Sequence, residues 1–168
     1  QIIDNILKIQ KKGTISLYKY ISCTNAEYSI SDLYDYSLFL NCVLMQYRLT
    51  KEKKYLSLAK TYSEYIFVNY YIPETGMFSK TSHEKPRIPI KRAPVIDYNT
   101  LSSNSIMAEN MLLLNQVIGG DGIYINTFKQ QIYNIEPQLI GSGPLMTGWG
   151  MQLLNYLTRY STSSPDEQ

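Results

Sequence analysis

The chain has 168 residues, the size of one domain, and is long enough to bury a hydrophobic core. Charged residues make up 18% of the sequence and the net charge is +2, so we expect no nucleic-acid or membrane partner. No apolar run reaches the length of a membrane span, and we expect a cytoplasmic protein. Because the chain opens with Gln and not Met, we expect a fragment of a longer protein.

The side-chain inventory limits the chemistry. The chain has 16 tyrosines and 4 phenylalanines, which indicates either a compositional bias or a ring-lined cleft suited to sugars. Cys23 and Cys42 form no CxxC motif, and Cys42 is expected to be a buried thiol in a helix. With His83 as the single histidine, the sequence offers no His-rich metal site, and we expect neither metal nor cofactor.

The first half of the chain predicts helices and a tight turn. A short helical stripe covers Ile2–Ile9, and Thr14–Ile21 alternates like an extended segment. After a cap at Ser31 or Asp32, apolar residues recur three and four apart over 33–49, and again over 55–66. Because a few polar residues separate these two runs, they predict an antiparallel helical hairpin.

The middle of the chain predicts a minor β-hairpin. Pro73–Gly76 is a turn by composition, and Met77–Lys80 and Arg87–Ile90 resemble two short strands around a polar loop with His83. The basic residues here are expected to form a solvated hairpin in preference to a phosphate or nucleic-acid site; they are Lys85, Arg87, Lys91 and Arg92.

Asp97–Ser105 is a run of turn-forming polar residues that leads directly into an apolar helix ending near Gln116. Its side chains can bond to the turn backbone, cap the helix or bind an oxygen-rich ligand. Glycines at 119–122 end this unit, and a helix over Tyr124–Ile135 follows. Pro137 and the Gly141–Pro144 stretch are expected to interrupt the chain before a last helix over 146–157 and a polar tail at 161–168.

Hairpin-plus-loop units of about 50–60 residues are typical of large helical repeats, and we treat residues 1–160 as one domain. Leu33–Leu38 resembles the Leu-Glu-Asp-Tyr-Ala-Phe opening of a helix in the thioredoxin-domain-containing proteins related to spermatogenesis-associated protein 20. Thr75–Phe78 resembles that family's Gly-Gly-Phe-Phe strand. Arg92 and the Asp97–Ser105 run are similar to its Arg…Asp-Gly-Ala-Thr-Pro-Ser-Gly-Asn-Ser motif.

This resemblance implies an all-α fold in which antiparallel helical hairpins form part of an (α/α)6 toroid, similar to the six-hairpin glycosidases. It implies a role in carbohydrate binding or metabolism, and half a ring leaves catalysis by this chain alone in question. The alternative is a non-catalytic helical-repeat module that packs on the missing part of the toroid or on a second copy. A related epimerase would need placed histidines, which the single His83 does not supply.

Hydrolysis of a glycoside commonly needs two carboxylates, and the candidates are Asp35 and Asp97. Each also has a structural explanation, since Asp35 can stabilise a helix start and Asp97 a turn. A ligand site is expected where the 97–105 segment meets the helix that begins at Leu33; its candidate binding residues are Tyr34, Tyr36, Ser102, Asn104 and Trp149. Convergence of Asp35, Asp97 and Trp149 in one cleft would favour a sugar site, and their scatter would favour the interaction module.

Overall fold

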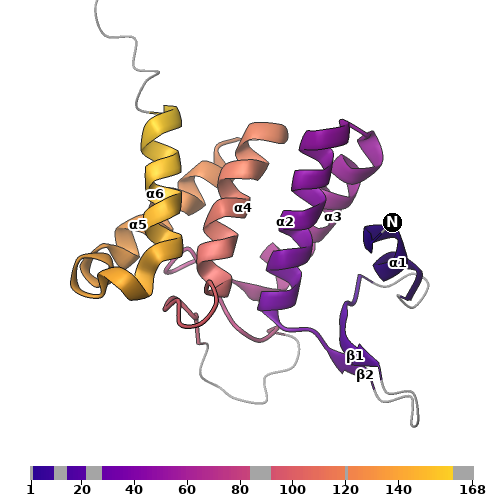
Figure 1. Ribbon diagram of the computed structural model, residues 1–168, viewed down its shortest axis with the longest axis horizontal. Helices are drawn as coiled ribbons and strands as arrows, with labels where there is room; N and C mark the ends of the chain where they lie inside the picture. Colours follow the sequence, from indigo (N-terminus) through magenta and orange to yellow (C-terminus); the bar gives the residue numbers. More distant parts are fainter. Residues whose placement is uncertain (1, 10–14, 22–27, 84–91, 120, 161–168) are drawn as a thin grey trace, which may run out of the picture.

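The computed structural model describes residues 2–9, 15–21, 28–83, 92–119 and 121–160, and Figure 1 shows how its elements are arranged. In chain order the elements are α1 (Ile2–Ile9), β1 (Tyr18–Ile21), β2 (Tyr28–Ile30), α2 (Leu33–Thr50), α3 (Lys53–Tyr70), β3 (Tyr71–Ile72), β4 (Met77–Phe78), α4 (Ser103–Val117), α5 (Ile123–Gly141), the short 3-10 helix η1 (Gly143–Met146) and α6 (Thr147–Tyr160). The described chain is mostly helical, which confirms the predicted all-α class.

The long helices form two layers. In Figure 1, α2, α4 and α6 stand side by side and begin at the same end of the molecule, while α3 and α5 lie behind them. Helix α2 packs on α3 and α4, and α4 packs on α5 and α6. The short connections make α2–α3 and α4–α5 antiparallel hairpins, as the apolar periodicity predicts.

Helix α2 illustrates how particular residues define the beginning, the end and the buried face of a helix. At its start the Asp32 carboxylate accepts a hydrogen bond from the Tyr34 amide at 3.0 Å, and Asp35 accepts one from the Asp32 amide at 3.4 Å. At its end Lys51 adopts a left-handed conformation (φ 58°), and its amide donates to the Tyr47 carbonyl at 2.8 Å. Between these caps, one face is fully buried; it comprises Leu33, Tyr36, Leu40, Val43 and Leu44.

Several tyrosines belong to the core. The Tyr36 ring lies 5.1 Å from that of Tyr65 and 5.6 Å from that of Tyr70, measured between centroids. The Tyr36 hydroxyl accepts a hydrogen bond from the Leu17 amide at 3.1 Å, which ties the N-terminal segment to α2. Burial raises the pKa of the Tyr36 phenol far above its ordinary range, so this side chain stays protonated. Part of the tyrosine excess is therefore explained by packing and not by a ligand.

The small strands differ from the prediction. Strand β4 pairs with β3 across the Pro73–Gly76 turn, with Tyr71 opposite Phe78. Gly76 has φ +68°, a conformation that glycine adopts without strain, and its amide donates to the Ile72 carbonyl at 2.9 Å. The partner strand expected at 87–90, most of the basic stretch, Cys23 and the tail at 161–168 lie outside the described residues. A second antiparallel pair, β1–β2, uses the predicted extended segment.

Two further local expectations are wrong. Helix α5 does not end before Pro137 but continues to Gly141. Ile135 is buried and Leu139 packs against the core, so tertiary contacts on both sides of the proline outweigh its cost of about 3 kcal/mol in a helix interior. Cys42 is exposed, because it projects away from the face of α2 that packs on the core.

Polar side chains also lie in the contact between α2 and α4. The Asn110 amide donates to the Ser37 carbonyl at 2.8 Å, and its oxygen accepts from Asn41 at 3.0 Å. The neighbouring Glu109 is half-buried. Burial raises the pKa of the Glu109 carboxyl above its ordinary value of 4.5, although a hydrogen bond from Asn41 and the positive charge of Arg48 act in the opposite direction.

We predict that Glu109→Gln is more stable than the parent protein at pH 7. A carboxyl whose folded pKa lies above its unfolded value loses its proton more readily when unfolded, so stability falls as the pH rises from about 4.5 through the folded pKa. Urea unfolding between pH 4 and pH 8 measures this, with the exposed Glu64→Gln as control. A difference between Glu109→Gln and the parent that does not grow with pH would contradict the prediction.

Candidate functional site

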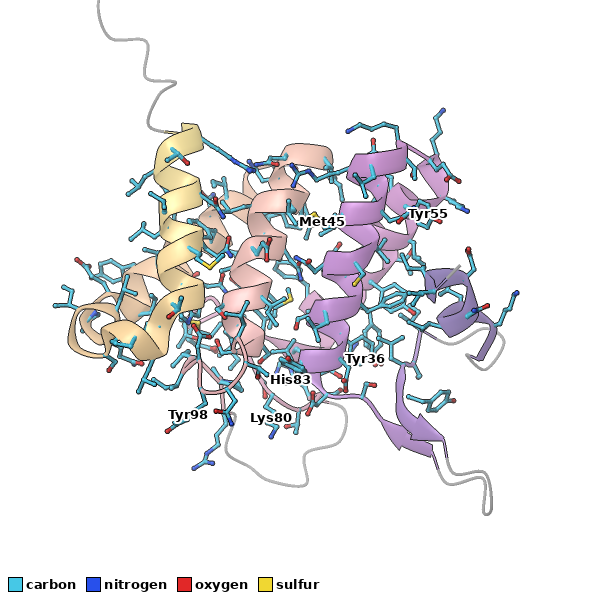
Figure 2. The ribbon with its side chains drawn as sticks, viewed as in Figure 1. Tyr36, Met45, Tyr55, Lys80, His83 and Tyr98 are labelled. Atoms are coloured by element: carbon cyan, nitrogen blue, oxygen red, sulfur yellow. The ribbon has the colours of Figure 1, made fainter. Side chains whose placement is uncertain are left out.

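A pocket of about 300 Å³ lies at the end of the molecule where α2 and α4 begin. We call it the α2–α4 pocket; it is lined by Asp32, Tyr34, Lys80, Pro94, Ile96, Tyr98, Thr100, Leu101, Ser102 and Ser103. Figure 2 shows Lys80 and Tyr98 at this end of the molecule. The pocket therefore lies at the junction where the sequence places a ligand site, between the 97–105 segment and the start of α2.

Asp97 is one of the predicted catalytic carboxylates, but it does not line this pocket. It is 5% exposed, and one of its oxygens accepts from the Ser102 amide at 2.6 Å and from the Ser105 hydroxyl at 2.9 Å. The other oxygen accepts from the Gly148 amide at 2.8 Å, near the start of α6. The Asp97 carboxylate thus links the start of α4 to the start of α6. It has a structural role, since these three hydrogen bonds occupy both of its oxygens.

Close approach at Gly148 makes this arrangement possible. A Cβ atom at this position would lie 2.8 Å from the Ser105 hydroxyl oxygen and 3.0 Å from a carboxylate oxygen of Asp97. Only glycine therefore allows the backbone of α6 to approach the carboxylate closely enough to donate to it. This glycine requirement comes from packing and not from its backbone angles.

Ser102 and Ser103 begin α4 and form part of the pocket wall. Ser102 is the N-cap residue, and its hydroxyl accepts from the Ser105 amide at 3.1 Å. Ser103 is the first residue of the helix and is 3% exposed, and its hydroxyl has no hydrogen-bond partner among the described residues. The predicted capping role of Ser102 is thus confirmed, and Ser103 provides an unused polar group at the pocket.

Asn104 is fully buried and does not line the pocket. Its oxygen accepts from the Phe78 amide at 2.8 Å, and its nitrogen donates to the Phe78 carbonyl and the Pro94 carbonyl, both at 2.9 Å. The side-chain amide thus pairs with β4 as a neighbouring strand would, and it holds the segment before Asp97 in place. The two N–H donors of the Asn104 amide are thus both used within the chain, and neither is directed at a ligand.

Tyr36 and Trp149 are likewise core residues. Tyr36 is fully buried, with its hydroxyl on the Leu17 amide. Trp149 is fully buried, and its indole nitrogen donates to the Val95 carbonyl at 2.8 Å. Neither ring has a face that a ligand could reach, so of the predicted binding residues Tyr34 and Ser102 line the α2–α4 pocket, while Tyr36, Asn104 and Trp149 do not.

Asp35 lines a different pocket. This second pocket has a volume of about 290 Å³ and lies between α1 and α2, with mostly apolar walls that include Ile3, Leu17 and Phe39. Asp35 and Asp97 therefore do not face one another across a cleft. An acid and a base that act on one glycosidic bond would line the same pocket, and this pair does not.

Of the ten residues that line the α2–α4 pocket, eight were not among the predicted binding residues, and the polar ones of these are Asp32, Lys80, Tyr98, Thr100 and Ser103. Tyr98 and Ser103 belong to the polar run at 97–105, and their place in that run is the sequence signal for them. Lys80 follows β4, and its amide donates to the Arg92 carbonyl at 2.7 Å. Only the folded path of the chain brings Lys80 to the start of α2 and α4.

The comparisons with known proteins add no family. Searches of the chain against family models, curated proteins and solved structures find no match. Within the described ranges, no three His, Cys, Asp or Glu side chains gather closely enough to hold a metal ion. None of the described helices has both the length and the apolar character that crossing a membrane requires.

We predict that Asp97→Ala lowers the free energy of unfolding by at least about 1.5–3 kcal/mol, the contribution of one hydrogen bond to a charged group, because it removes three such bonds that form one non-additive network. Urea unfolding measures the loss, and Asp121→Ala, at an exposed site, is the matched control. Equal unfolding midpoints for the two variants would contradict the structural role of Asp97.

Proposed function

We propose that this chain binds a carbohydrate in the α2–α4 pocket without catalysing its hydrolysis. The observation that carries this proposal is the composition of the pocket wall. Tyr34 and Tyr98 offer rings with hydroxyl groups, and Ser102, Ser103 and Thr100 add short polar groups between them. An aromatic face beside hydroxyl and amide groups suits a ligand that has apolar ring faces and many hydroxyls.

Binding without turnover follows from the carboxylates. Among the residues that line the pocket, Asp32 is the one carboxylate, and it already caps α2 through the Tyr34 amide. Asp35 lies in the other pocket, and Asp97 is enclosed by donors from α4 and α6. An acid and a base on opposite sides of a glycosidic bond are therefore missing from the described part of this pocket.

The arrangement of the helices supports the toroid fold that the family resemblance implies. We propose that it is the C-terminal toroid portion of a six-hairpin glycosidase-like, thioredoxin-domain-containing protein. In an arc of such a toroid, successive inner helices run parallel and outer helices run antiparallel to them. The layer of α2, α4 and α6, with α3 and α5 behind it, is compatible with that geometry (Figure 1).

Binding of sugars tests the proposal directly. We predict that glucose, mannose or N-acetylglucosamine gives saturable chemical-shift changes, and that Tyr34→Ala or Tyr98→Ala weakens binding about tenfold, the effect of losing about 1.4 kcal/mol. Tyr133→Ala is the matched control, because Tyr133 is exposed on α5 and does not line the pocket. Absence of saturable binding by the parent protein, or equal affinities for all three variants, would contradict the proposal.

A second function, the helical-repeat interaction module, is favoured by two observations. Asp35, Asp97 and Trp149 are scattered and do not share a cleft. On α6 a stripe of apolar side chains three residues apart is exposed: Met151 at 53%, Leu154 at 63% and Leu157 at 47%. Such a stripe is typical of a helix face that packs on another element.

We predict that this stripe causes self-association at micromolar concentration, because pairing of two copies would remove its apolar side chains from water. Sedimentation velocity measures the association, and Leu154→Glu should shift the protein towards the monomer. Lys129→Glu, an exposed change on α5, controls for the effect of charge. A parent protein that stays monomeric would count against a module that pairs with itself.

A further inference from the structure

The unused hydroxyl of Ser103 indicates what kind of group the α2–α4 pocket holds. Ser103 lines the pocket and is 3% exposed, and its hydroxyl has no hydrogen-bond partner in the described chain. Leaving a buried hydroxyl unpaired costs about 1–3 kcal/mol, so a partner from outside the chain would recover that free energy. Its hydroxyl can donate to an oxygen atom of a ligand.

The start of α4 adds free amide donors at the same place. The amide of Ser102 donates to Asp97, and the amide of Ser105 donates to the Ser102 hydroxyl. The amides of Ser103 and Asn104, which lie between them, have no hydrogen-bond partner within the described residues. Free amides and the positive end of the helix dipole both favour a negatively charged oxygen.

The charged side chains around the pocket also favour a negatively charged ligand group. Lys80 is exposed and lines the pocket, and no carboxylate of the described chain forms an ion pair with it. Asp32 also lines the pocket, but its carboxylate is bonded to the start of α2 at the Tyr34 amide, where the dipole of that helix offsets its charge. The Lys80 ammonium and the positive end of the α4 dipole therefore both lie at the wall of this pocket.

We propose that the carbohydrate bound in this pocket carries a carboxylate or a phosphate, and that this anionic group binds between the Ser103 hydroxyl, the free amides of α4 and the Lys80 ammonium. The inference rests on the proposed function, since it specifies the class of sugar for the same pocket. The two tyrosines contact the ring of the sugar, and Ser103 and Lys80 contact its charged group.

A comparison of matched ligands tests the proposal. Titrations followed by NMR use glucose, glucuronate, glucose 6-phosphate and inorganic phosphate, at low salt and at 0.3 M salt. Glucuronate or glucose 6-phosphate should bind about tenfold more tightly than glucose, and salt should reduce this advantage because it screens exposed charges. The comparison of glucuronate with glucose 6-phosphate distinguishes the two kinds of anionic group.

Variants assign the preference to the named residues. Ser103→Ala and Lys80→Gln should each remove most of the tenfold advantage in affinity that the anionic sugars have over glucose. Ser103→Thr, which keeps the hydroxyl, should retain the advantage, and Lys129→Gln on α5 is the control for charge. Thermal midpoints equal to that of the parent protein establish that the variants are folded.

The outcomes separate this inference from the proposed function. Equal affinities for glucose and for both anionic sugars would overturn the anionic preference while carbohydrate binding stands. Binding of inorganic phosphate with no binding of any sugar would support the anion site and overturn the carbohydrate function. Binding of no probe at all would overturn both.

Discussion

The carboxylate of Asp97 is the interaction on which the polar end of this molecule depends. Its two oxygens accept from the Ser102 amide, the Ser105 hydroxyl and the Gly148 amide, so one side chain joins the start of α4 to the start of α6. Because the carboxylate is 5% exposed, water cannot replace these donors. The position of α6 beside α4 is therefore coupled to the path of the segment that enters α4.

Asn104 complements this link on the other side of α4. Its amide holds Phe78 through two hydrogen bonds and Pro94 through a third, so β4 and the segment before Asp97 are fixed to the same helix turn. Together, Asp97 and Asn104 fix the backbone at Ser102 and Pro94, two residues that line the pocket. A pocket built on such a backbone requires little ordering when a ligand binds, which favours affinity.

Residues of the same type differ in whether their polar group is already hydrogen-bonded within the chain. Tyr36 is buried with its hydroxyl bonded to the chain, whereas Tyr98 is 81% exposed at the pocket. The Ser102 hydroxyl accepts a hydrogen bond as the cap of α4, whereas the hydroxyl of the adjacent Ser103 has no partner among the described residues. Groups already bonded within the chain contribute to stability, and groups left without an internal partner are available to a ligand. This criterion, and not residue type, separates the residues with a structural role from those of the proposed binding site.

The sequence by itself determined where the long helices lie, although not where α5 ends. Apolar residues three and four apart predicted α2, α3, α4 and α6, because burial of one face of a helix requires that spacing. Asp32, Ser102 and the turn-forming run at 97–105 predicted caps, because their short side chains bond to nearby backbone. The same run also marked the end of the molecule where the α2–α4 pocket lies.

Only the tertiary structure decided which polar residues are left for a ligand. Asn104 bonds to Phe78, Asp97 to Gly148 and Trp149 to Val95, and each of these partners lies far away in the sequence. Local patterns cannot reveal such pairs, because they depend on how the helices pack. Packing also carried α5 through Pro137, since contacts on both sides of the proline outweigh its local cost. Long-range contacts therefore determine which side chains line the pocket. Local hydrogen bonds determine where the surrounding helices begin.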